Sequence, residues 1–239
     1  MPAWLVFEAV QTKLPHYTLP MFPALMLLGA AWAMDPLRHP PPRWWRGVAR
    51  AVLVGVAAGL ALLAMALPWW LSRQVLPSGL LAVVAAVLLV AVTWRSARSG
   101  AWGRAGLGAA LLAVPLYAAV LEGVVPRLDA MWIAPRIAAV LRAEAPGLAA
   151  SDFGITGYSE PSVVFATGAE AKLLNTGTDA ARFLAAGPGR VVAVGNRAEA
   201  DFRREAAALG LQPQEIGTVT GFNYSRGRWL TLILFKAAT

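Results

Sequence analysis

The 239-residue sequence contains no cysteine and few charged residues. The lack of cysteine excludes a disulfide framework, a thiol nucleophile and a cysteine-based metal site. Only 14% of the residues are charged, whereas 58% are hydrophobic and the mean hydropathy is +0.57. This balance favours a membrane protein over a soluble domain.

Acidic residues are nearly absent from the first half of the chain. Only Glu8, Asp35 and Glu122 precede position 124, and the other ten of the 13 acidic residues follow it. Nine basic residues precede that position and twelve follow it. A net charge of +8 raises the question of nucleic acid, but the sequence has no compact basic face with interleaved aromatic residues, so we expect no nucleic-acid partner. The basic excess is better explained as a topology signal.

Four uncharged apolar stretches approach the length of about 20 residues that spans a bilayer core. They cover residues 17–34, 51–71, 76–94 and 105–121. The sequence therefore predicts a membrane α-helical region, 17–123, with about four transmembrane helices, preceded by a loop segment, 1–16. Four buried helices of a soluble core are disfavoured, because a chain of this size could not cover that many apolar segments.

The arginines between the spans predict the orientation of the chain. The connector between the second and third spans holds only Arg73, whereas the other two connectors hold seven arginines. Because short cytoplasmic loops are enriched in Lys and Arg, we expect the arginine-rich connectors in the cytoplasm. Segment 1–16, the Arg73 connector and the tail then face outward. The seven arginines are Arg38, Arg43, Arg46, Arg50, Arg95, Arg98 and Arg104.

The tail, 126–239, is expected to form a small soluble α/β domain. Helical spacing over 129–145, 179–186 and 199–209 alternates with strand candidates at 153–158, 162–167, 190–195 and 229–236. This alternation predicts a layered sheet. The Gly187-Pro-Gly189 segment precedes an apolar strand, whereas the glycines of a dinucleotide loop follow one. We interpret it as a plain turn and expect no cofactor.

The most unusual segment is TKLPHYTLPMFP, residues 12–23, at the expected outer end of the first span. Its prolines stiffen the backbone and hold a cation, an imidazole and a phenol at the membrane surface. Lys13 can pair with a phosphate as a point charge, and Tyr17 can donate a hydrogen bond to one. The pattern suits the head of a phospholipid-like substrate, with His16 as a further candidate. On spacing alone, interfacial anchoring of the helix by Lys13 and Tyr17 is an equally good interpretation.

The pattern TKLPHYxLPxxP resembles a segment of the aminoarabinose transferase and protein mannosyltransferase group, the bacterial membrane glycosyltransferases of glycosyltransferase family 39 with the GT-C architecture. The later helices and the stretch GYSEPSVVFATG, 157–168, are similar too. The resemblance covers essentially the whole chain and the carboxy-terminal part of the family's longer proteins. It implies that Lys13 and Tyr17 contact the phosphate of a polyprenyl-phosphate sugar donor. It also implies a location in the bacterial inner membrane with the tail in the periplasm, and transfer of the sugar to a periplasmic lipid or glycan acceptor such as lipid A.

The acidic catalytic residue of that family has no counterpart in this sequence, which begins after the family's first periplasmic loop. Sugar transfer needs a carboxylate that orients or deprotonates the acceptor. Glu8, Glu122 and Asp129 are the only carboxylates expected near the outer face, and none matches the acidic motif. We therefore assign no catalytic residue. We expect the chain to be incomplete alone, as a truncated product, a split subunit or a gene with its start placed too late.

Two other functional classes follow from the same observations. The missing carboxylate favours, as the alternative, a non-enzymatic membrane-anchored protein whose periplasmic domain binds a partner. A transporter is disfavoured, because the spans hold no internal charge and no inverted repeat. No metal site is expected, since His16 and His39 fall on opposite sides of the membrane in the predicted topology.

Overall fold

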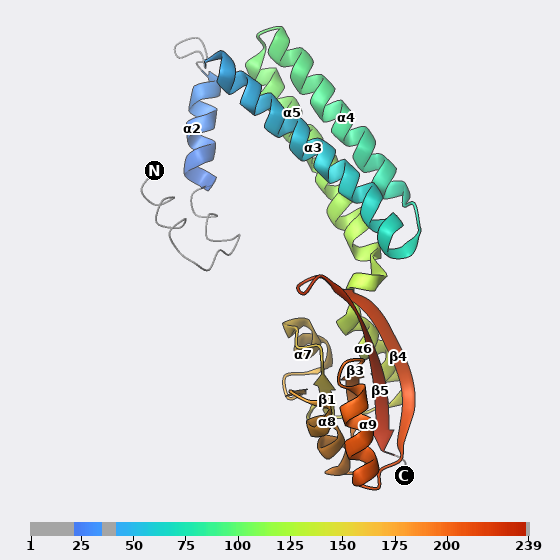
Figure 1. Cartoon of the computed structure of the whole chain (residues 1–239). Helices are drawn as coiled ribbons and strands as arrows, with labels where there is room; N and C mark the ends of the chain where they lie inside the picture. Colours follow the sequence, from blue (N-terminus) through green and yellow to red (C-terminus); the bar gives the residue numbers. More distant parts are fainter. Residues whose placement is uncertain (1–21, 35–41, 238–239) are drawn as a thin grey trace. The chain divides into compact units, whose positions relative to one another are not determined.

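The computed structural model describes residues 22–34 and 42–237, which belong to two compact units (Figure 1). Unit 1 consists of Met1–Trp69 and Gln74–Val125, and its described part is helical. Unit 2 consists of Trp70–Arg73 and Pro126–Thr239 and contains a mixed sheet with helices. Membrane-type helices thus precede an α/β domain, as the sequence predicts.

Three helical stretches of the described chain are long and apolar enough to cross a membrane, which indicates a membrane protein. They are Trp44–Ser72, Pro77–Arg98 and Trp102–Arg127. A shorter apolar helix, α2, spans Phe22–Met34, and the first predicted span begins outside the described residues. The count of four spans therefore stays a prediction. The longer helices are α3 (Arg43–Ser72), α4 (Pro77–Arg98) and α5 (Trp102–Ala118), which the π-helical segment η2 (Ala119–Val124) continues.

Small residues bring α4 and α5 into close contact. A Cβ on Gly108 of α5 would lie only 2.9 Å from a side-chain carbon of Val92 on α4. The two helices can therefore approach this closely because Gly108 has no side chain. At the other end of the pair, the Ser78 hydroxyl donates a 2.8 Å hydrogen bond to the Gly123 carbonyl. Small residues and short polar bridges of this kind hold helices together where water is absent.

Unit 2 begins with short 3₁₀ turns and the helix α6 (Ile133–Glu144). The helices that follow are α7 (Pro161–Thr167), α8 (Gly177–Ala185) and α9 (Glu199–Ala208), and the 3₁₀ turns are η3 (Val125–Arg127), η4 (Asp129–Met131) and η5 (Ala150–Asp152). The strands are β1 (Phe153–Thr156), β2 (Lys172–Leu174), β3 (Val191–Gly195), β4 (Pro213–Asn223) and β5 (Arg228–Ala237). Helix α8 starts at a capping box, in which Thr176 and Asp179 each bond the other's backbone N–H at 3.1 Å.

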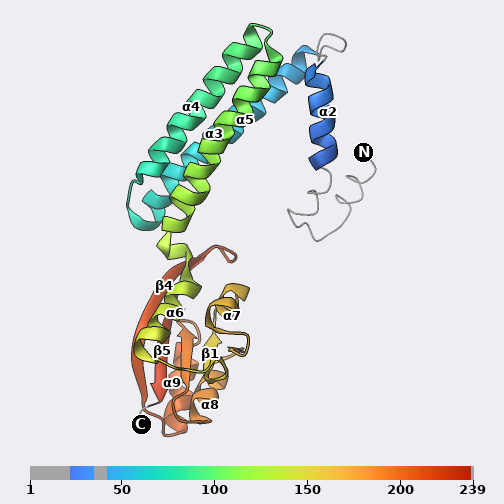
Figure 2. The ribbon, with the colours of Figure 1, turned by 180° about the vertical axis from the view of Figure 1, so that it is seen from behind.

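The five strands form one sheet in the order β2-β1-β3-β5-β4. Strands β1, β2 and β3 are parallel, whereas β5 runs antiparallel to both β3 and β4. Helices α6 and α7 cover one face and α8 and α9 the other, which gives three layers (Figures 1 and 2). All five residues of β3 are buried, as expected for a central strand covered on both faces.

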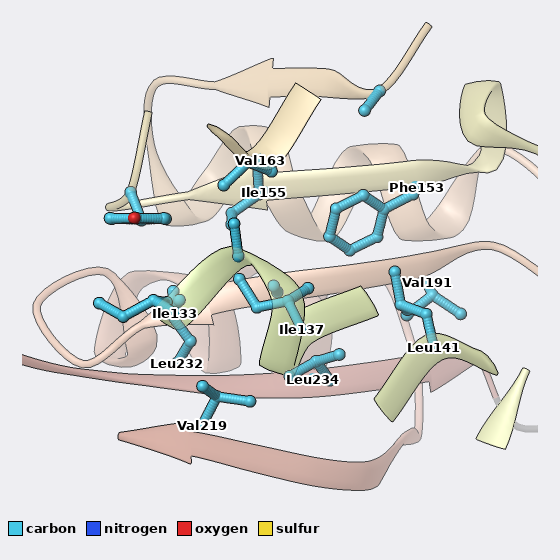
Figure 3. Packing of buried hydrophobic residues seen from close by; sticks show 14 of the residues in the cluster. Ile133, Ile137, Leu141, Phe153, Ile155, Val163, Val191, Val219, Leu232 and Leu234 are labelled. Atoms are coloured by element: carbon cyan, nitrogen blue, oxygen red, sulfur yellow. The ribbon is translucent and has the colours of Figure 1, made fainter. Parts of the chain in front are cut away.

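The core under α6 shows why its apolar spacing specifies a helix (Figure 3). Ile133, Ile137 and Leu141 recur every four residues and are at most 8% exposed. They pack in one cluster with side chains of the sheet that include Val219 and Leu234. Burial of each such side chain stabilises the fold by about 1.5–3 kcal/mol relative to exposure. This cluster fixes α6 against β4 and β5.

One predicted element is wrong and two were missed. The segment 162–167, predicted as a strand from its Val-Val-Phe run, lies in the helix α7. Pro161 occupies the first turn of that helix, where its fixed φ favours helix initiation, and only Val163 needs to be buried. Strands β2 and β4 were not predicted. The other predicted helices and strands of the tail are confirmed within a few residues of their bounds.

Candidate functional site at the carboxyl edge of the sheet

The carboxyl ends of β1 and β3 form the topological switch point of the sheet. These neighbouring parallel strands lead into α7 and α9, which lie on opposite faces. Their connecting loops therefore leave the strand ends towards opposite faces of the sheet. In open α/β sheets this is where ligands bind, because the loops can present polar groups without disturbing the core.

Two glycines let the diverging loops start side by side. Gly157 follows β1 with a φ of +86°, and a Cβ there would lie 3.1 Å from the Cα of Gly195 at the end of β3. A larger residue at position 157 would be strained and would push the two strand ends apart. The ends of β1 and β3 therefore meet backbone to backbone.

Thr156, the last residue of β1, carries a polar atom in an apolar setting. Its side chain is 1% exposed, and its hydroxyl has no hydrogen-bond partner among the described residues. A buried hydroxyl without a partner costs about 1–3 kcal/mol in proteins. Buried polar groups without a hydrogen-bond partner occur at functional sites more than elsewhere in a fold.

Tyr158 lies next in the loop after β1 and is 4% exposed. Burial raises the pKa of its phenol, a hydrogen bond with Ser162 lowers it, and the nearby Glu160 and Tyr224 raise it, with burial the largest effect. The net direction is upward from 10.0, so the phenol is neutral at physiological pH. A neutral phenol can both donate and accept hydrogen bonds.

The β4–β5 hairpin loop is tied to the loop after β1. Asn223 is 3% exposed, and its side-chain oxygen accepts bonds from the Ser225 hydroxyl at 2.8 Å and the Arg226 N–H at 3.2 Å. The Ser225 hydroxyl also donates to Glu160. These bonds fix the hairpin loop beside the loop after β1, and Tyr224 is 58% exposed.

Three arginines gather at the same edge. The Asn196 N–H donates a 2.9 Å bond to the Thr231 carbonyl, which places the loop after β3 beside β5. Partial desolvation and repulsion from Arg197 and Arg226 hold the pKa of Arg228 below its usual value. Mutual repulsion of guanidinium groups is relieved by an anion, because each group offers planar, fork-shaped donors to phosphate or carboxylate. The carboxyl edge is therefore suited to an anionic ligand.

The donor-site residues predicted from the sequence cannot be compared with this edge. Lys13, His16 and Tyr17 lie outside the described residues, as does Glu8. Glu122 is exposed in η2 of unit 1, and Asp129 is exposed in η4 of unit 2. Within the described ranges, no group of three or more His, Cys, Asp or Glu side chains is placed to hold a metal ion.

Sequence reasoning left Tyr158 and Glu160 without a role and did not single out Thr156 or the arginines. The available signal was a glycine at the ends of two strands: Gly157 follows β1 and precedes Tyr158, and Gly195 ends β3 and precedes Asn196. This pattern indicates a site only once the order of the strands in the sheet is known. Strand order brings Arg197 and Arg228 together across more than thirty positions of sequence.

Comparisons of the chain with protein-family models, with curated proteins and with solved structures found no match.

Proposed function

We propose that the chain is the carboxy-terminal part of a membrane glycosyltransferase that moves a sugar from a polyprenyl-phosphate donor to a periplasmic acceptor. The observation that carries the proposal is the TKLPHY segment with its lysine, imidazole and phenol. Lys13 and Tyr17 bind the donor phosphate, and His16 is a third candidate at the same site.

The start of α2 supports this role. Phe22 is the first described residue of α2, and Tyr17 and Lys13 precede it by five and nine positions. The covalent chain therefore limits their distance from Phe22 to at most about 18 Å and about 32 Å. A polyprenyl chain is apolar and its phosphate is charged, so a binding site needs cationic and donor groups beside apolar surface.

The carboxyl edge of unit 2 supplies a second recognition site in this proposal. Arg197, Arg226 and Arg228 would meet negative groups of an acceptor such as lipid A. Tyr158, at the same edge, would offer its neutral phenol to this ligand. A hydrogen bond to a charged group contributes about 1.5–3 kcal/mol, so loss of one arginine contact should be measurable.

Donor binding can be measured on the chain itself. The 239-residue protein in detergent micelles should bind polyprenyl phosphate more tightly than the matching polyprenol. Lys13→Ala should weaken phosphate binding by about 1.5–3 kcal/mol, and Tyr17→Phe should weaken it less because the ring remains. Lys172→Ala removes an exposed lysine of unit 2 and is the matched control.

Equal binding of polyprenol and polyprenyl phosphate would contradict the proposed donor site. Loss of affinity in Lys172→Ala as large as that in Lys13→Ala would show that net charge, and not Lys13, determines binding. Sugar transfer to lipid A in a radiolabel assay, abolished by Lys13→Ala, is the test of the reaction itself.

An apolar groove favours the non-enzymatic alternative, in which unit 2 binds a partner. The groove has a volume of about 670 Å³ and lies between α6 and α7, where Phe165 is 95% exposed. An exposed aromatic side chain beside apolar surface is typical of an interaction site. A photo-crosslinking residue at position 165 should then capture a periplasmic protein, and one at the exposed Leu209 should not.

A further inference from the structure

Unit 1 contains an apolar groove with arginines at one end. The groove has a volume of about 1250 Å³ and is lined by α3, α4 and the start of α5. Its volume exceeds the ~300–1,000 Å³ of typical small-molecule pockets. Exposed aliphatic side chains such as Leu62 and Val87 line its length, and Arg95, Arg98, Ser99 and Arg104 line one end.

The groove follows from how α3 meets α4. The two helices touch near Gly79, where a Cβ would lie 2.8 Å from the Ala64 carbonyl oxygen. From there to their other ends, the lining residues Val54 and Ala91 leave space between the helices. On α4 the groove runs from Val83 to Arg98, a rise of about 22 Å. One leaflet of a bilayer core is about 15 Å thick, so an acyl chain fits along it.

The arginine end has the chemistry of a lipid headgroup site. Arg50 and Arg98 lie over the Trp94 ring, with their guanidinium carbons 5.0 and 5.2 Å from its centroid. These contacts hold both guanidinium groups at the level where Trp94 favours the membrane interface. Arg95 and Arg104 add two more positive charges.

Negative charge is scarce around this cluster. Within 22–34 and 42–125, the described part of unit 1, Glu122 is the only acidic residue, and it follows the opposite end of α5. Four arginines without a carboxylate among the described neighbours attract an anion. An apolar groove that ends in such a cluster matches a phospholipid with a negatively charged headgroup.

We propose that this groove binds an anionic phospholipid, with an acyl chain between α3 and α4 and the headgroup phosphate at Arg95, Arg98 and Arg104. The inference does not rest on the proposed glycosyltransferase function or on Lys13. By the arginine count, the headgroup belongs to the cytoplasmic leaflet. Bound lipid fills the space between the helices and stabilises unit 1.

Native mass spectrometry of the full chain in detergent tests the proposal with phosphatidylglycerol and phosphatidylcholine of identical acyl chains. Phosphatidylglycerol should bind about tenfold more tightly, a difference of about 1.4 kcal/mol. The double change Ala97→Arg/Arg98→Gln keeps the net charge but turns one arginine by about 100° around α4. It should lower the affinity for phosphatidylglycerol about tenfold and leave phosphatidylcholine unaffected.

A second pair of variants tests the apolar part of the site. Ala91→Phe places a ring in the groove and should weaken phosphatidylglycerol binding several-fold, whereas Ala110→Phe, on an exposed part of α5 outside the groove lining, should not. Lys172→Ala removes an exposed lysine of unit 2 and should leave the affinity unchanged. The melting temperature without lipid checks that each variant is folded.

Three outcomes would overturn the proposal. Equal affinity for both lipids would remove the role of the arginines. Full affinity in Ala97→Arg/Arg98→Gln would show that diffuse surface charge attracts the lipid. A lipid-free dimer that dissociates in Ala91→Phe would assign the groove to a second copy of the chain.

Discussion

Replacing Thr156 by Val should stabilise unit 2. The change removes a hydroxyl that is buried without a partner among the described residues and keeps the branched shape of the side chain. Burial of an unsatisfied hydroxyl costs about 1–3 kcal/mol, and the lower part of that range, about 1–2 kcal/mol, is the expected gain. A gain of 1.4 kcal/mol corresponds to about tenfold slower exchange of amide hydrogens that exchange through global opening of unit 2.

Thr231→Val provides the matched control in the same sheet. The Thr231 hydroxyl lies 3.1 Å from that of Thr220 on the exposed side of β5, so its removal loses a hydrogen bond. This control should destabilise unit 2 by about 0.5–1.5 kcal/mol, opposite in sign to Thr156→Val. Hydrogen–deuterium exchange of the β1 and β3 amides in the full chain measures both. Faster exchange in Thr156→Val would refute the reasoning, because it would mean that the Thr156 hydroxyl makes a stabilising bond.

Further outcomes are expected elsewhere in the chain. The pKa of Tyr158 is raised above 10.0, so its neutral form stabilises the fold. This stabilisation is complete below about pH 10 and is lost as the pH rises through the folded-state pKa. Tyr158→Phe should therefore make the free energy of unfolding depend less on pH in alkaline solution. Gly177→Ala should destabilise by about 1–3 kcal/mol in chemical denaturation, since its Cβ would lie 2.6 Å from a backbone nitrogen of α9, whereas Gly187→Ala, with 3.4 Å to its nearest neighbour, should change stability by less than about 0.5 kcal/mol. Cysteines introduced singly at Ser99 and Ser225 should differ in intact cells, with only Ser225→Cys labelled by an impermeant thiol reagent; equal labelling would contradict the orientation.

Hydropathy alone located the apolar helices, because a bilayer requires long uncharged stretches and little else. The predicted spans 51–71 and 105–121 lie inside longer helical stretches, and the span 76–94 begins one residue before α4. α3 begins at Arg43 and α4 ends at Arg98, since helix geometry continues past the apolar core into the arginine-rich ends. Pro115 did not end the last helix; η2, with its wider π-helical turn, follows it directly.

Strand β4 shows why part of the sheet could not be predicted. Its glycines weaken any strand signal, but the packing of α6 requires them. A Cβ on Gly217 would lie 2.7 Å from Val140, and one on Gly221 would lie 2.7 Å from the Ala130 carbonyl oxygen. Position along the chain gives no hint of these contacts, because α6 and β4 are far apart in sequence. The carboxyl-edge site escaped prediction for the same reason, since its arginines come from separate loops.

The arginines of unit 1 have two physical roles that respond to different changes. The orientation of a membrane protein depends on how many positive charges each connector holds, and their exact directions around a helix matter little. A lipid headgroup site depends on direction, because Arg98 must lie over Trp94 and border the groove. The number of arginines in each connector can be read from the sequence, but the direction in which Arg98 lies on the helix requires the structure. A variant that keeps the count and changes the direction therefore leaves the topology intact while removing the lipid site, and this separation makes the two interpretations independently testable.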